Sequence, residues 1–117
     1  MGLKGNTDMV IKKPSIFIYE YEADRELLKE VCAGMEEEGV FVEIFSTKSG
    51  TVDEKAWRAA NDSMLGTGIG MNRDRIALQM KGLSIGRNVE AYDCPTAEQC
   101  RKIGANSARS IKKMAFK

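Results

Sequence analysis

The chain has 117 residues, of which 43% are hydrophobic and 30% charged, the composition of one folded domain rather than of a disordered segment. Its formal net charge is only +1, so no overall field draws it to nucleic acid or to anionic lipid. Histidine is absent, which removes the most common general base near neutral pH and the most common metal ligand.

No uncharged run approaches the roughly 20 apolar residues that a membrane span requires, and the opening residues lack the apolar core of a secretory signal. We therefore expect a cytoplasmic protein without a membrane partner. Cys32, Cys94 and Cys100 show no CxxC spacing, so we expect three reduced core residues rather than a zinc or redox site.

The first residues differ in pattern from the rest of the chain. Residues 1–13 carry no hydrophobic periodicity and are expected to form a flexible N-terminal arm, which leaves a single α/β domain at residues 14–117. Residues 15–21 (SIFIYEY) are β-branched and aromatic with few polar positions, which predicts a strand buried on both faces.

The next segment alternates helix and strand. Apolar residues recur every four positions in residues 23–38, and Gly39 is placed to end that helix. A second strand is predicted at residues 40–45 (VFVEIF). Residues 51–54 (TVDE) form a capping box that starts a helix running to about Asn61. The residues expected on its inner side are Ala56, Trp57 and Ala60.

The second half of the chain contains strands and a final helix. Strands are predicted at residues 75–80 (RIALQM) and 88–92 (NVEAY), and residues 96–99 (TAEQ) form a second capping box. The last helix is expected to bury one narrow seam, made of Cys100, Ile103, Ser107, Ile111 and Met114. With the glycine-rich segment counted as a strand, the order is βαβαβββα, which predicts an α/β layered sandwich of a mostly parallel sheet with about three helices.

Residues 66–73 (GTGIGMNR) raise the question of a phosphate-binding loop. A dinucleotide fingerprint requires G-x-G-x-x-G between a strand and a helix, whereas the spacing here is G-x-G-x-G and the next residues predict a turn and a strand. No G-K-[ST] follows, so a P-loop is also excluded. We interpret the segment as a central strand whose glycines allow a helix or a partner's backbone to approach closely, with Asn72, Arg73 and Asp74 as the turn.

Glu36, Glu37 and Glu38 occupy the end of the first helix, where the helix dipole disfavours anions. One interpretation is a solvated acidic patch. Another is a binding site for a cation, either an arginine of a partner or a metal, and carboxylate oxygens suit magnesium or calcium. A third is a small enzyme that uses Glu37 and its neighbours as acid and base, which would require an enclosed pocket.

The last helix is basic. Its cations are Arg101, Lys102, Arg109, Lys112, Lys113 and Lys117, and no acidic residue follows Glu98. Cations are favoured at a helix C-terminus in any case, but they also permit the alternative of a small α/β nucleic-acid-binding module that uses this helix.

Three blocks together resemble a known family. They are GMEEEGV (residues 34–40), SMLGTGIGMNRDRIALQMKGL (residues 63–83) and RKIGANSARSIKKMAF (residues 101–116). In this order they are similar to the small (beta) subunit of the reactivating factor, or reactivase, of cobalamin-dependent diol and glycerol dehydratases, over residues 15–116.

The resemblance implies the fold of the dehydratase medium subunit and a chaperone-like role without catalysis by this chain. It implies two partners, a large ATPase subunit that binds ATP and ADP, and an inactivated diol or glycerol dehydratase. The factor is expected to release damaged cobalamin by subunit exchange, in the cytoplasm or in association with a bacterial microcompartment. No cofactor is expected on the chain alone.

The resemblance also implies a site residue. The glutamate at the centre of the EEEG block is Glu37, which is expected to contribute to a divalent cation site, for Mg or Ca, shared with the large subunit. The chain departs from the family pattern at Met64, where proline is usual, at Thr67, where an aliphatic residue is usual, and in its lack of histidine.

Overall fold

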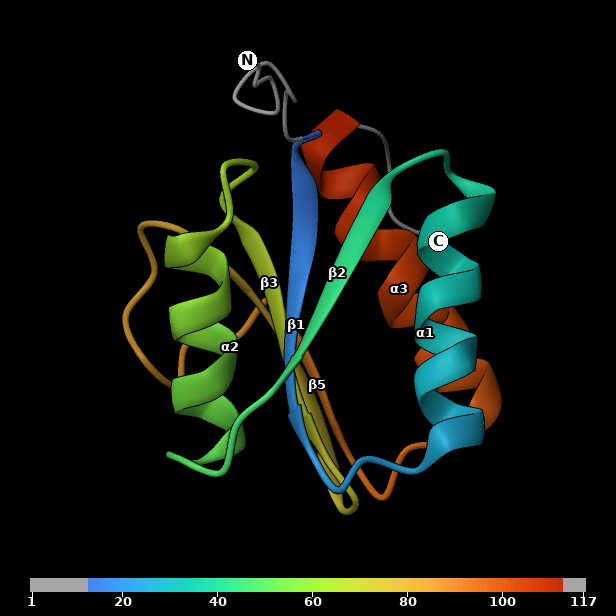
Figure 1. The fold of residues 1–117 in the computed structure, drawn as a ribbon, viewed down its shortest axis with the longest axis vertical. Helices are drawn as coiled ribbons and strands as arrows, with labels where there is room; N and C mark the ends of the chain where they lie inside the picture. Colours follow the sequence, from blue (N-terminus) through green and yellow to red (C-terminus); the bar gives the residue numbers. More distant parts are fainter. Residues whose placement is uncertain (1–12, 113–117) are drawn as a thin grey trace, which may run out of the picture.

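A computed structural model of the chain describes residues 13–112, which form a five-stranded sheet with helices on both faces (Figure 1). The predicted arm lies outside the described residues except for Lys13. The predicted order of elements is confirmed. The elements are β1 (Ser15–Tyr21), α1 (Arg25–Glu37), β2 (Phe41–Ser46), α2 (Val52–Asp62), β3 (Thr67–Asn72), β4 (Arg75–Met80), β5 (Glu90–Asp93) and α3 (Ala97–Lys112).

The sheet has the strand order β2-β1-β3-β4-β5. β1 pairs in parallel with both β2 and β3, as expected from the helical connections, whereas the β3–β4 and β4–β5 pairings are antiparallel. The prediction of a mostly parallel sheet is therefore wrong, and the sheet is mixed. The reason is the short turn after β3, where the Asn72 side chain accepts hydrogen bonds from the backbone N–H groups of Asp74 and Arg75. Such a turn can only return the chain antiparallel.

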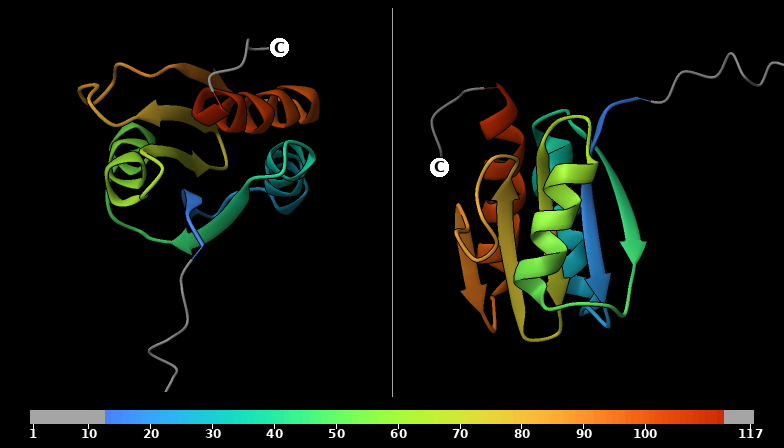
Figure 2. Two further views of the ribbon diagram at one scale, coloured as in Figure 1. Left: turned by 90° about the horizontal axis from the view of Figure 1, so that it is seen from above. Right: turned by 90° about the vertical axis from the view of Figure 1, so that its left-hand side faces the viewer.

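The helices divide unevenly between the two faces of the sheet. In the right-hand view of Figure 2, α2 lies in front of the sheet while α1 and α3 lie behind it. The main core fills the side of α1 and α3, and it includes Ile16, Ile18, Val31, Met35, Ile69, Met71, Ile76, Leu78, Cys100 and Ile103. No helix within residues 13–112 combines the length and hydropathy needed to cross a bilayer.

Both predicted capping boxes are present. The Thr51 hydroxyl accepts from the N–H of Glu54, and the Glu54 carboxylate accepts from the N–H of Thr51. Thr96 and Gln99 make the same reciprocal pair of hydrogen bonds at the start of α3. These local signals set where α2 and α3 begin because they satisfy N–H groups that have no partner within the helix.

The glycines of β3 have the predicted packing role. A Cβ atom on Gly68 would lie 2.2 Å from the backbone nitrogen of Ala60, and one on Gly70 would lie 2.3 Å from the carbonyl oxygen of Val52. The backbone of α2 therefore rests directly on β3, and only small side chains fit between them.

This close packing corrects one residue of the predicted inner face of α2. Ala56 and Ala60 are fully buried, as expected, but Trp57 is only half-buried. Trp57 follows Ala56 and so points about 100° away around the helix. The narrow space over the glycines has no room for an indole ring, which lies on the outer side of α2 instead.

Two further predictions of burial require correction. β1 buries Ile16 and Ile18 on the side of α1 and α3, but Phe17, Tyr19 and Tyr21 on the opposite face are only half-buried, since α2 covers little of that part of the sheet. α3 buries a broad face rather than a narrow seam, because α1 packs along it as well. The residues buried on α3 are Cys100, Ile103, Gly104, Ala105, Asn106, Ser107 and Ala108, and Met114 of the predicted seam lies outside the described residues.

Candidate functional site

The acidic end of α1 lies beside the basic helix α3. The colours of Figure 1 show that α1 and α3 run in the same direction, so the C-terminal parts of both helices meet at the same end of the molecule. Arg109 Nη1 donates to Glu38 Oε2 at 3.1 Å, and Lys112 Nζ donates to the Glu38 carbonyl oxygen. The unfavourable position of Glu38 on its own helix is thus offset by cations of another helix.

Glu37 has a different environment from Glu38. Its Oε2 atom accepts from Arg101 Nη1 at 3.1 Å, and the Nε atom of the same arginine donates to Glu30 Oε1, also at 3.1 Å. The Glu37 side chain is 51% exposed, whereas that of Glu38 is 11% exposed. Glu38 therefore anchors α1 to α3, while Glu37 presents its carboxylate at the surface.

The Glu37 carboxylate does not form a complete metal site by itself. Among residues 13–112, no three histidine, cysteine, aspartate or glutamate side chains are grouped so that they could hold an ion. A half-exposed carboxylate could supply one ligand of a metal site whose remaining ligands are water molecules and groups of a second chain. Mg²⁺ is commonly bound in this way, by one or two carboxylates while it keeps several waters.

The ion pairs also weaken the two alternative functions. Arg101, Arg109 and Lys112 are engaged with α1, so they do not form an unpaired basic face for phosphates; Lys113 and Lys117 lie outside the described residues. Acid–base catalysis by the glutamates is not supported either, because Glu36 is exposed and Glu37 lies in an ion pair on the surface.

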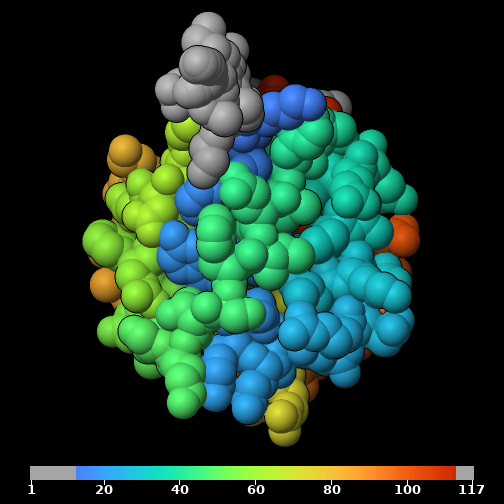
Figure 3. All heavy atoms as spheres, in the orientation of Figure 1, coloured from blue at the N-terminus to red at the C-terminus, as the bar shows by residue number. Residues whose placement is uncertain are grey.

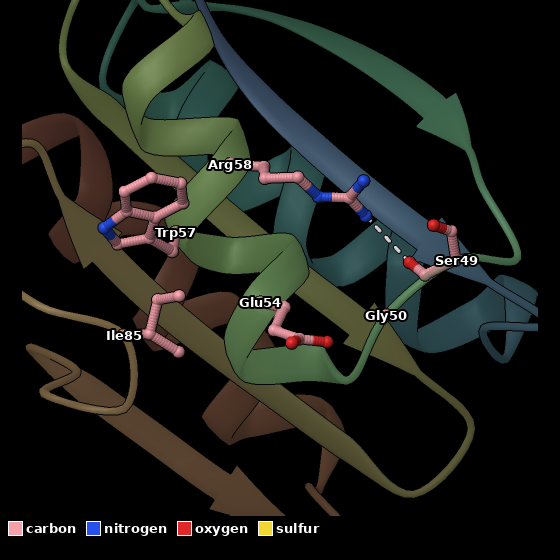
Figure 4. Close-up of a pocket in the computed structure, with 6 residues that line it drawn as sticks. All are labelled: Ser49, Gly50, Glu54, Trp57, Arg58 and Ile85. Atoms are coloured by element: carbon pink, nitrogen blue, oxygen red, sulfur yellow. Dashed lines mark hydrogen bonds between the residues drawn. The ribbon is translucent and has the colours of Figure 1, made fainter.

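A depression on the outer side of α2 has a volume of about 330 Å³ (Figure 4). Its apolar wall consists of Trp57 and Ile85, which face each other in the view. Its polar groups serve the local backbone: Glu54 caps α2, and Arg58 Nη2 donates to the Ser49 carbonyl oxygen at 2.7 Å. Because these groups are already committed to the fold, the depression has the chemistry of a surface groove rather than of a catalytic centre.

The thiols are correctly predicted as free cysteines, but not all of them lie in the core. Cys100 is buried, and burial raises its pKa to about 11. Cys32 is partly buried, and its pKa is raised mainly by burial and further by Glu36. A raised pKa keeps a thiol protonated and unreactive near neutral pH. Cys94 is exposed after β5, which corrects the expectation of a core position.

The β2 edge of the sheet carries an exposed aromatic surface. The parallel register places Phe41, Glu43 and Phe45 of β2 on the same face as Phe17 and Tyr19 of β1. The rings of Phe17 and Phe45 meet edge to face, with centroids 5.0 Å apart.

Helix α2 does not cover this surface, and Phe41 and Phe45 remain 54% and 40% exposed. In Figure 3 the green atoms of β2 and the following loop run down the middle of the visible face. The surface thus combines unpaired edge backbone with large apolar side chains.

The sequence did not identify either of these surface features. The link from Glu30 through Arg101 to Glu37 joins residues far apart in the chain, and only the packing of α1 on α3 brings them together. The strand predicted at residues 40–45 is confirmed as β2 with its bounds shifted by one residue, but the sequence of a strand does not show whether it lies at the edge or inside the sheet. The strand order decides that position.

Comparisons with known proteins agree on one family. The sequence model of a family described as dehydratase medium subunit matches residues 13–117. The propanediol dehydratase-reactivating factor small subunit of Citrobacter freundii is 30% identical over 105 residues, which are 89% of this chain and 90% of the relative. The diol dehydratase-reactivating factor small subunit of Klebsiella michiganensis is also 30% identical over 105 residues, with 89% and 84% of the two chains covered.

Solved structures have the same fold. A diol dehydratase-reactivating factor complexed with ADP and Mg²⁺ contains a chain that matches with a TM-score of 0.84 and 29% identity, over 91% of this chain and 99% of that one. A glycerol dehydratase reactivase matches with a TM-score of 0.83 over 90% and 97% of the two chains, and at 24% identity this likeness concerns the fold alone.

Proposed function

The chain belongs to the family of small subunits of diol and glycerol dehydratase-reactivating factors, and from this premise we propose that it serves a cobalamin-dependent dehydratase as a non-catalytic exchange subunit. Its partners are a large ATPase subunit and the inactivated dehydratase. The large subunit binds and hydrolyses ATP, while this chain docks and undocks as a rigid body. Damaged cobalamin leaves through the gap that the exchange opens.

Similarity to two kinds of protein, the dehydratase medium subunit and the reactivating-factor small subunit, supports this proposal. Residues 13–117 match the sequence model of the dehydratase medium subunit, yet the relatives that match along nearly their whole length are reactivating-factor small subunits. A chain with the fold of the dehydratase medium subunit can exchange with that subunit on the large subunit of the reactivating factor. Shared fold thus supports exchange between the two assemblies.

The surface of the described residues supports a role within an assembly. An unblocked edge strand with exposed phenylalanines is a liability in a free protein, because it can pair with other chains. Phe41, Ile44 and Phe45 are exposed on β2. Coverage by a partner subunit removes this liability.

We place Glu37 at a divalent cation site shared with the large subunit. The half-exposed carboxylate at the negative end of α1 supports this role, since the helix dipole favours a cation there. Mg²⁺ or Ca²⁺ would link this carboxylate to oxygen ligands of the large subunit. Glu37 would hold the ion from this side, and Glu38 would keep α1 fixed against α3.

Reconstitution tests the function. Inactivated dehydratase is incubated with the large subunit, ATP, Mg²⁺ and fresh cobalamin coenzyme, with and without this chain. We expect activity to return only when both subunits are present, and a dehydratase that recovers equally well without this chain would contradict the proposal. Pull-down of the dehydratase medium subunit by the large subunit, with release of this chain, tests the exchange itself.

The cation site is tested by pairing with the large subunit in a magnesium titration. Glu37→Gln keeps the size of the side chain but removes its charge, so we expect pairing to lose most of its dependence on magnesium while the melting temperature changes little. Glu36→Gln is the matched control, because it removes the same charge from the neighbouring exposed residue. Unchanged magnesium dependence in Glu37→Gln would contradict the assignment.

A further inference from the structure

Arg101 bridges two carboxylates of α1. Its Nε and Nη1 atoms each donate at 3.1 Å, to Glu30 and Glu37 respectively. All three side chains are partly exposed, Glu30 at 36%, Arg101 at 44% and Glu37 at 51%. The guanidinium is therefore the internal counter-ion of a carboxylate at the surface.

A divalent cation and Arg101 would compete for the Glu37 carboxylate. Glu37 Oε2 lies in the hydrogen bond with Arg101, and a second positive charge beside the guanidinium is repelled. When an ion binds Glu37, Arg101 loses one of its two partners. It is not left without a counter-ion, because its Nε atom retains Glu30.

Breaking the Arg101–Glu37 ion pair costs little free energy. The pair is half-exposed, so water replaces the lost hydrogen bond and the cost is that of a surface ion pair. The surrounding fold need not move, since Arg109 and Glu38 hold the two helices together independently.

We propose that Arg101 is an internal competitor for the cation: it occupies Glu37 in the free subunit and releases it to the divalent ion at the junction with the large subunit. This inference rests on the cation site proposed above. Arg101 thereby sets the magnesium concentration at which the small subunit pairs, and it holds the Glu37 side chain beside α3 until the ion arrives.

The experiment measures pairing with the large subunit across a magnesium titration, using the full-length chain. Arg101→Gln removes the competitor, so we expect the midpoint to fall by about two- to fivefold, the factor that corresponds to a half-exposed ion pair. Lys102→Gln is the matched control, because it removes one positive charge from an exposed neighbouring position of α3. Arg101→Lys keeps the charge without the forked geometry and should give an intermediate midpoint.

The outcomes separate this inference from the proposed function. If Glu37→Gln abolishes the magnesium dependence while Arg101→Gln and Lys102→Gln share the wild-type midpoint, the competition is refuted and the cation site stands. If Arg101→Gln pairs more weakly than Lys102→Gln, Arg101 contacts the partner directly and the inference also fails. If Glu37→Gln keeps the full dependence, the cation site itself is wrong. Thermal melting of each isolated variant shows that it is folded before pairing is measured.

Discussion

The crossing of α1 and α3 depends on glycines, and Gly104→Ala tests how strictly. A Cβ atom at position 104 would lie 2.1 Å from the carbonyl oxygen of Val31. An ordinary carbon–oxygen contact is about 3.4 Å, so the two helices would have to separate by roughly 1 Å. The obstacle is backbone, which cannot rotate away as a flexible side chain does.

The cost follows from the core that the two helices share. A gap of roughly 1 Å forfeits about a quarter to a half of the dispersion energy across the interface, and overpacked cores typically lose about 1–3 kcal/mol, with larger values where backbone must move. The higher helix propensity of alanine offsets about 1 kcal/mol of this loss in the free energy of unfolding. We therefore expect a net loss of about 1–3 kcal/mol in the free energy of unfolding, which lowers the urea midpoint by about 1 M.

Urea unfolding followed by circular dichroism measures this change. Gly34→Ala should behave similarly, because its Cβ atom would lie 2.2 Å from the carbonyl oxygen of Arg101. The double variant should lose less than the sum of the two single changes, since helices already separated by one alanine accommodate the second more easily. A Gly104→Ala protein as stable as the wild type, or more stable, would show that the crossing is loose and would refute the reasoning.

The remaining predictions concern a buried hydroxyl and two tyrosines. Thr67 is 1% exposed and its hydroxyl has no hydrogen-bond partner among the described residues, so Thr67→Val should raise the free energy of unfolding by about 1 kcal/mol in the same urea assay. Thr51→Val, the same chemical change at a capping residue, should lower the free energy of unfolding by about 1 kcal/mol. If both variants shifted the free energy of unfolding in the same direction, this account would be contradicted. The hydrogen bond to Glu90, together with burial, raises the pKa of Tyr92 to about 12, and burial and Asp62 raise the pKa of Tyr19 to about 12. Because the neutral form is favoured in the folded state, this stabilisation is complete below pH 10 and is lost as the pH rises through 12. Tyr92→Phe should flatten the fall in melting temperature over that range, and an unchanged pH profile would argue against the shift.

Local patterns determined most of the element boundaries. The two capping boxes set the starts of α2 and α3, because each threonine satisfies an N–H group only three residues away. The glycines at 68 and 70 indicated a strand that a helix approaches closely, and the structure confirms it. The three motif blocks were sufficient to identify the family, which the comparisons confirm. All of these signals lie within short stretches of chain, where the local backbone geometry fixes how far apart two residues lie.

Tertiary structure decided the features that depend on which elements become neighbours. The sequence does not reveal that β2 is an edge strand, because strand order is a property of the whole sheet, and so the exposure of Phe41 and Phe45 could not be foreseen. The expectation of a mostly parallel sheet was wrong for the same reason, since it counted the helical connections and not the pairings that follow β3. The partner of Glu37 is likewise long-range: Arg101 reaches it only because α1 and α3 pack together in the same direction. The charge pattern marked Glu36, Glu37 and Glu38 as unusual and the family resemblance selected Glu37, but only three-dimensional packing shows that Arg101 is its ion-pair partner.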